Sequence, residues 1–224
     1  MLNNFLFVGF PYVALVIAVV VSILRFTWRP FSYSSLSSQF LETDTLFWGS
    51  SLWHWGILWV LSGHFVAFCI PQAILAWDAR PLRLYLLEIT GLSMALLALV
   101  GVVTLLVRRF TDRRIKVVTT WLDLVLLGVL LFQVSTGIDV AIRFRWGSAW
   151  FSTNAAPYLW SLLKLAPRPE FITPLPWMVK AHLLSGFTVL LLLPFTRLVH
   201  FLVVPVFYYW RRPQVVIWNR KGVR

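Results

Sequence analysis

The sequence predicts an all-α integral membrane protein, a bundle of five transmembrane helices, and three observations lead to this fold class. Hydrophobic residues make up 59% of the 224 residues, whereas charged residues make up only 12%. The mean hydropathy is +0.80. Five apolar runs reach about 20 residues, the length that an α-helix needs to cross the hydrocarbon core of a bilayer. A soluble domain could not cover its surface with so few charges.

The five predicted spans follow one another in chain order. They cover residues 5–24, 46–70, 85–107, 120–142 and 177–205. The first span is expected to be a retained anchor and not a signal peptide, because Arg25 and Arg29 follow the apolar run and no basic residue precedes it. Pro71 is expected to end the second span, and Pro81 precedes the third.

The fifth span contains Pro194, which is expected to kink its helix. A long segment at 143–176, Pro-rich at its end, separates it from the fourth span, and the sequence assigns it no role. Residues 1–224 are predicted to form a single membrane domain with a basic tail at 206–224. The chain shows no internal repeat, which disfavours an inverted-repeat transporter.

The distribution of basic residues predicts the topology. Lys and Arg number 20 against 8 Asp and Glu. An N-terminus outside and a C-terminus in the cytoplasm place twelve basic residues in cytoplasmic segments and six in outer segments, as the positive-inside rule requires. The cytoplasmic set is Arg25, Arg29, Arg108, Arg109, Arg113, Arg114, Lys116, Arg211, Arg212, Arg220, Lys221 and Arg224. The net charge of +12 therefore indicates membrane orientation, and no nucleic-acid partner is expected.

All four histidines fall within two predicted spans. His54 and His64 lie in the second, and His182 and His200 in the fifth. Ionisable side chains at membrane depth are costly and are candidates for function. The alternative is that each histidine only forms hydrogen bonds between helices. Their restriction to two helices, in pairs, favours a functional site.

The spacing of the histidines predicts how they pair. The second and fifth helices run antiparallel, so His54 should face His200 near the cytoplasmic side and His64 should face His182 near the outer side. The spacings of ten and eighteen residues correspond to about 15 Å and about 27 Å along a helix. Eighteen residues are five whole turns, which would put both histidines of the fifth helix on one face.

These unequal spacings disfavour a single zinc site and favour two planar cofactors. Haem is the natural candidate, because imidazole is its usual axial ligand. Cys69 is the one cysteine and the chain has no CxxCH motif, so two non-covalent haems b are expected. Gly63, Gly56 and Gly186 lie near the histidines and are expected to give the haems room.

Several charged residues lie near the histidines or within the spans. Lys180 and Arg197 are candidates for pairing with haem propionates, although Lys180 could equally be an interfacial anchor. Glu88, Asp123 and Asp139 could serve proton release or pair with arginines.

Two segments resemble a known family. Residues 50–65, with His54 and His64, are similar to the second helix of the gamma subunit of respiratory nitrate reductase. Residues 194–205, around His200, resemble the end of that subunit's fifth helix. Residues 37–40 and 118–120 also agree. The similarity covers most of the chain, but 143–176 diverges.

The resemblance implies a dihaem cytochrome b in the cell membrane of a prokaryote. Such a subunit oxidises quinol near the outer face and passes electrons inward to an iron–sulfur subunit. A molybdopterin catalytic subunit then reduces nitrate, so no catalytic residue for nitrate is expected in this chain. His54 and His200 would ligate the cytoplasmic-side haem iron, and His64 and His182 the outer-side haem iron.

The resemblance also suggests a quinol site. In the family a lysine after the second helix is associated with quinol binding, and Arg83 falls near that position. Gly63, His64 and Arg83 are therefore the candidates. Arg83 could instead be an arginine that reaches lipid phosphate.

The sequence is also compatible with other functions. The same dihaem core could serve a heterodisulfide-reductase-like or sulfite-reduction-linked complex, or a nitrite oxidiser in which electrons flow the other way. A haem-free channel with histidines lining a polar pathway is a different class. It would need more Asp, Glu, Ser and Asn in the spans than this sequence has.

Overall fold

The computed structural model of the chain describes residues 1–28, 44–144 and 147–203, and every regular element in these ranges is helical. Within these ranges, five helices are long and apolar enough to cross a membrane, which confirms the predicted number of spans. They are Leu2–Trp28, Phe47–Cys69, Pro81–Thr111, Trp121–Arg143 and Trp177–Phe195.

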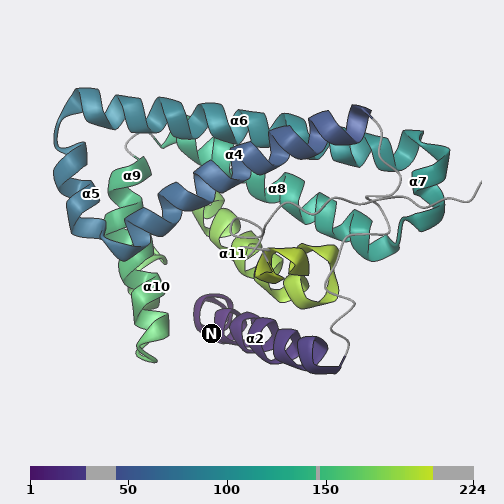
Figure 1. Cartoon of the computed structure of the whole chain (residues 1–224). Helices are drawn as coiled ribbons and strands as arrows, with labels where there is room; N and C mark the ends of the chain where they lie inside the picture. Colours follow the sequence, from purple (N-terminus) through teal and green to yellow (C-terminus); the bar gives the residue numbers. More distant parts are fainter. Residues whose placement is uncertain (29–43, 145–146, 204–224) are drawn as a thin grey trace, which may run out of the picture.

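The main helices of these spans pack in a fixed order (Figure 1). They are α2 (Phe10–Trp28), α4 (Asp44–Cys69), α6 (Pro81–Thr111), α8 (Trp121–Arg143) and α11 (Trp177–Leu192). The first of them continues from two short turns, α1 (Leu2–Asn4) and η1 (Phe5–Gly9). Helix α4 packs along α6, α8 packs on both α6 and α11, and α11 packs on α2.

In the part of the chain that the structure describes, the apolar core forms two clusters. One joins α4, α6 and α8 through Trp53, Ala98, Val102, Leu126, Leu130 and Val134. The other includes α2 and α11 and consists of Phe7, Ala14, Tyr158, Leu162, Ile172 and Phe187. The two helices that carry histidines, α4 and α11, therefore contribute buried residues to different clusters.

Two glycines allow α4 and α6 to approach closely. A Cβ added at Gly56 would lie 2.5 Å from the backbone nitrogen of Ala98, and one at Gly101 would lie 2.4 Å from that of Trp53. Small residues permit such backbone contact between membrane helices. The expectation that Gly56 makes room for a haem is thus wrong, because Gly56 faces α6.

The segment at 143–176, to which the sequence assigned no role, folds into helices. We call residues 147–163 the cap: α9 (Gly147–Trp150), the π-helical turn η3 (Phe151–Ala155) and α10 (Ala156–Leu163). A 3₁₀ turn, η4 (Pro169–Phe171), lies between the cap and α11. The cap packs beside α5 (Pro71–Asp78), which connects α4 to α6. We call this end of the bundle the cap end.

Hydrogen bonds attach the cap to the N-terminal helices and to α4. The Tyr158 hydroxyl donates to the carbonyl of Phe7 at 2.7 Å, and Tyr12 donates to the carbonyl of Leu162 at 3.0 Å. Burial raises the pKa of the Tyr158 phenol, which therefore stays protonated and able to donate. Trp160 Nε1 donates to the carbonyl of Phe68 at the end of α4, at 2.9 Å.

Prolines and caps define the helix ends. Both α5 and α6 have a proline in the first turn, where its missing N–H costs no hydrogen bond. The third span begins at Pro81 and ends at Thr111, so it extends beyond the predicted 85–107 at both ends. At the opposite end of the bundle, which we call the α7 end, lies the short helix α7 (Arg113–Val118). Helix α8 begins there with a capping box between Thr120 and Asp123.

The fifth span is broken and not merely kinked. Helix α11 ends at Leu192 and is followed by two 3₁₀ segments, η5 (Leu193–Phe195) and η6 (Arg197–Val203). Pro194 lacks an N–H to continue the helical hydrogen bonds, and Thr196 between the segments is extended. The argument that whole turns put His182 and His200 on one face therefore does not apply. The predicted end at 205 and the tail at 206–224 lie outside the described residues.

Candidate functional site

The structure brings the four histidines together in two pairs. The ring centroids of His54 and His200 are 6.1 Å apart, and those of His64 and His182 are 6.5 Å apart. The first pair lies toward the α7 end and the second toward the cap end. These are the pairs that the antiparallel arrangement predicts. Within the described ranges, no group of three or more His, Cys, Asp or Glu side chains could hold a metal ion.

Three of the imidazoles are oriented by backbone carbonyls of their own segment. Their Nδ1 atoms contact carbonyl oxygens as follows: His54 to Ser50 at 2.7 Å, His64 to Val60 at 2.8 Å and His200 to Arg197 at 2.7 Å. A carbonyl can only accept, so Nδ1 carries the proton and Nε2 keeps a lone pair. This tautomer is the one that a metal-ligating histidine needs when it binds through Nε2.

His182 is oriented by the neighbouring helix α8. Its Nδ1 lies 3.0 Å from the carbonyl oxygen of Gln133 and 3.1 Å from Oγ1 of Thr136. The side-chain amide nitrogen of Gln133 lies 3.3 Å from Nε2, and the carbonyl of the same amide accepts a hydrogen bond from Ser185. A Cβ at Gly137 would come within 2.9 Å of the ring, so the glycine is needed for this close approach.

Sequence reasoning missed this contribution of α8. The available signal was Gln133, an uncharged polar side chain within a predicted apolar span. Polar side chains in such positions commonly form hydrogen bonds between helices.

The distances within both pairs fit one metal ion between two imidazoles. A bond from a metal to an imidazole nitrogen is about 2 Å, so the two nitrogens are about 4 Å apart and the ring centres about 6 Å apart. Both observed separations agree with this value. A Cβ at Gly63 would meet no atom within 4 Å, so this position leaves space beside His64.

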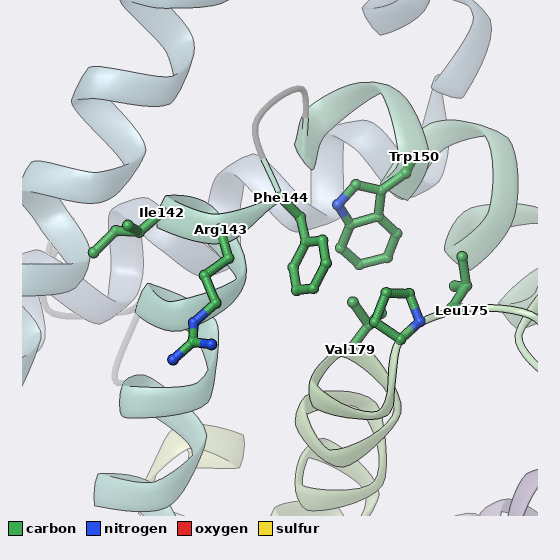
Figure 2. Close-up of a pocket in the computed structure, with 7 residues that line it drawn as sticks. Ile142, Arg143, Phe144, Trp150, Leu175 and Val179 are labelled. Carbon is green, nitrogen blue, oxygen red and sulfur yellow. The ribbon is translucent and has the colours of Figure 1, made fainter.

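A pocket of about 520 Å³ lies at the cap end, between the end of α8, α9 and the start of α11 (Figure 2). It is lined by Ile142, Arg143, Phe144, Trp150, Leu175, Pro176 and Val179. The Arg143 guanidinium forms an ion pair with Asp139 at 2.6 Å. Val179 lies three residues before His182, so the pocket is about one helical turn from that ligand candidate.

An aromatic residue of the cap contacts His64. The ring of Phe151 in the cap lies 5.1 Å from the His64 ring in an edge arrangement. Arg83, in the first turn of α6, stacks over the ring of Trp77 in α5 at 4.7 Å. The assignment of Arg83 to a quinol site stays a prediction.

At the α7 end, Arg197 is bound by a carboxylate of the protein. Its Nε donates to Asp123 at 3.1 Å, and its Nη2 donates to the carbonyl of Val118 at 3.1 Å. Arg109 lies 3.8 Å from the same carboxylate. Asp123 and Asp139 thus both pair with arginines, one of the two roles expected for them. Lys180 is partly buried, and its role as a propionate partner stays a prediction.

The fold and the site define a multi-pass membrane protein with two facing histidine pairs, carried by α4 on one side and by α11 and η6 on the other. Residues 3–219 match the family described as nitrate reductase gamma subunit. The chain belongs to this family and is therefore a membrane subunit of nitrate reductase, an oxidoreductase complex.

Three relatives match nearly full length. The nitrate reductase gamma chain of Bacillus subtilis (strain 168) is 32% identical over 205 residues, which are 90% of this chain and 92% of the relative. The respiratory nitrate reductase 1 and 2 gamma chains of Escherichia coli (strain K12) are 30% and 28% identical over 219 residues, 96% of this chain. These alignments cover 97% and 96% of the two relatives.

Proposed function

We propose that this chain is the quinol-oxidising dihaem cytochrome b subunit of its complex, with the cap end outside and the α7 end in the cytoplasm. The proposal is carried by one observation: the four imidazoles face one another in two pairs, and each Nδ1 atom contacts a backbone carbonyl oxygen. When bound, each haem b would carry one electron at a time from quinol toward the partner subunits.

The histidines have defined roles in this proposal. His54 and His200 hold the haem at the α7 end, and His64 and His182 hold the haem at the cap end. The backbone carbonyls fix the ring orientation and keep Nε2 deprotonated. For His182 to bind iron through Nε2, the side-chain amide nitrogen of Gln133 must turn away from that atom. The hydroxyl of Ser185, which already donates to the amide oxygen of Gln133, remains available as a partner.

Quinol is proposed to bind at the cap end, near Gly63, His64 and Arg83. Stacking on Trp77 holds the Arg83 guanidinium in place. A fixed cation there stabilises the anion that forms as quinol loses its first proton. Electrons that enter outside and leave in the cytoplasm move against the membrane potential, at about 2.3 kcal/mol per 100 mV, and the protons are released outside.

The proposed partners are an iron–sulfur subunit and a molybdopterin catalytic subunit that reduces nitrate. Helix α7 presents Arg113, Arg114 and Lys116 at the end where such a partner would dock. Membership in the nitrate reductase family favours these partners over heterodisulfide-reductase-like or sulfite-reduction-linked complexes. Electron flow from nitrite toward quinone is the alternative direction. Co-purification of the complex, followed by assays with quinol and with nitrite, distinguishes these cases.

The first prediction concerns haem content. Two haems b per polypeptide are expected, because two pairs of imidazoles are available and each pair binds one iron. Pyridine haemochrome analysis of the purified complex measures this ratio, once the haem content of any partner is subtracted. One haem or none per chain would contradict the proposal, and none would favour a haem-free channel.

The second prediction concerns topology. In a Cys69→Ser background, a cysteine replacing Leu163 in the cap is expected to react with a membrane-impermeant maleimide in intact cells. In cells that make this chain without the partner proposed to dock on α7, a cysteine replacing Val117 is expected to react only after the membrane is permeabilised. Both native side chains are exposed, so each cysteine is accessible from its own side. The reverse labelling pattern would show that the proposed orientation is wrong.

A further inference from the structure

His200 does not lie on the helix that carries His182. It lies on η6, beyond the break at Pro194, and the chain from Leu193 to Val203 is 3₁₀ or extended. Such short segments have poorer hydrogen-bond geometry than an α-helix. The position of the His200 ring therefore depends on contacts from other helices.

One set of contacts comes from the start of α8. Arg197 donates from Nε to Asp123 at 3.1 Å and from Nη2 to the carbonyl of Val118 at 3.1 Å, so two bonds attach η6 to α8 and to the end of α7. The Asp123 side chain is 7% exposed, and its other oxygen accepts the N–H of Thr120 at 3.0 Å. The carboxylate is thus itself fixed in the helix cap.

The same arginine holds the histidine through its backbone. The carbonyl of Arg197 lies 2.7 Å from Nδ1 of His200. The contacts therefore run from the Asp123 carboxylate to the Arg197 side chain, and from the Arg197 backbone to the imidazole. A shift of Arg197 moves the carbonyl that sets the ring orientation.

A second contact comes from α2. Arg25 Nη1 donates to the carbonyl of Pro194 at 2.6 Å and to that of Thr196 at 3.2 Å. These carbonyls lie at the break, where helical hydrogen bonding is interrupted. Arg25 thus holds the beginning of the non-helical segment, and Asp123 holds η6 next to His200.

We infer that Asp123 is a positioning residue for His200, and that its ion pair with Arg197 keeps His200 bound to the iron at the α7 end. This inference rests on the proposed function, because it presupposes that His200 ligates haem. Without the carboxylate charge, Arg197 and Arg109 would remain close together in a poorly solvated place, and their repulsion would displace Arg197.

The test uses the Asp123→Asn variant in the complete membrane-bound complex. A haem with two axial histidines does not bind carbon monoxide, whereas a haem that has lost one does. We expect carbon monoxide to bind about one haem per chain in Asp123→Asn and none in the wild type. The low-spin electron paramagnetic resonance signal assigned with His54→Ala should weaken, and that assigned with His64→Ala should persist. Asp123→Glu should restore the wild-type behaviour, because it keeps the negative charge.

Asp139→Asn is the matched control. Asp139 lies on the same helix and also pairs with an arginine, Arg143, but at the cap end. This variant should leave the His54–His200 haem signal unchanged. If it changed that signal as strongly as Asp123→Asn does, the effect would be a general one on α8 and the inference would be wrong.

The remaining outcomes also decide the question. If Asp123→Asn does not accumulate in the membrane, Arg197→Gln is read by the same measurements, since it leaves the cap of α8 intact. Two native haem signals without carbon monoxide binding, in whichever variant is read, would overturn the inference while the proposed function stands. A wild-type complex in which this chain holds no haem would overturn the proposed function itself.

Discussion

His54→Ala and His200→Ala are expected to remove the same haem, and His64→Ala and His182→Ala the other. The reason is the geometry of the two pairs, whose ring centroids are 6.1 Å and 6.5 Å apart. Redox titration of the four variants, followed in the haem absorption bands, measures which component disappears. Quinol-dependent nitrate reduction should fall to the background in all four, because each removes one of two carriers in series.

A soluble electron-donating dye provides the control for the histidine variants. Dyes that reduce the catalytic partners directly bypass the membrane subunit, so dye-dependent nitrate reduction should persist if the complex is assembled. A common haem lost in His54→Ala and His182→Ala would show that the proposed pairing is wrong. Normal quinol oxidation in any of the four variants would exclude haem ligation by that residue.

Arg83→Ala is expected to slow quinol oxidation ten- to a hundredfold, while both haem spectra stay intact. A hydrogen bond to a charged group contributes about 1.5–3 kcal/mol, which corresponds to that range of rates. Stopped-flow reduction of the haems by a quinol analogue measures the rate. Arg83→Lys should retain more activity than Arg83→Ala, because it keeps the positive charge.

Arg143→Ala is the matched control for Arg83. Both arginines lie at the cap end, but Arg143 lines the pocket of Figure 2 and pairs with Asp139. Slow haem reduction in Arg143→Ala with a normal rate in Arg83→Ala would place quinol in that pocket. Normal rates in both variants would leave Arg83 as an interfacial anchor stacked on Trp77.

The sequence alone determined the number of spans and the pairing of the histidines. The thickness of the bilayer sets the length of a span, and apolar runs of that length can be recognised in the sequence alone. Antiparallel order follows from counting the helices between the second and fifth spans, so the partners of His54 and His64 could be predicted without coordinates. The choice of haem depended on the chemistry of imidazole and on the lack of a cysteine set.

The helix ends and the contacts around the histidines were decided by the tertiary structure. Pro194 was visible, but whether it kinks or breaks a helix depends on partners such as Arg25, which stabilises the freed carbonyls from another helix. Gln133 is 49 residues from His182, and no periodicity along one helix predicts a contact across that separation.

The same reason explains one expectation that the structure changed and one contact that it added. The position of Gly56 in the sequence does not show whether it faces α6 or the histidines, because that depends on which helix packs against it. The Asp123 carboxylate on another helix lies 3.1 Å from Arg197, a contact that the sequence did not specify, and the role of Arg197 as a propionate partner stays a prediction. Spacing along the chain determines what lies on one helix, whereas packing between helices determines which side chains meet, and only the folded chain contains that information.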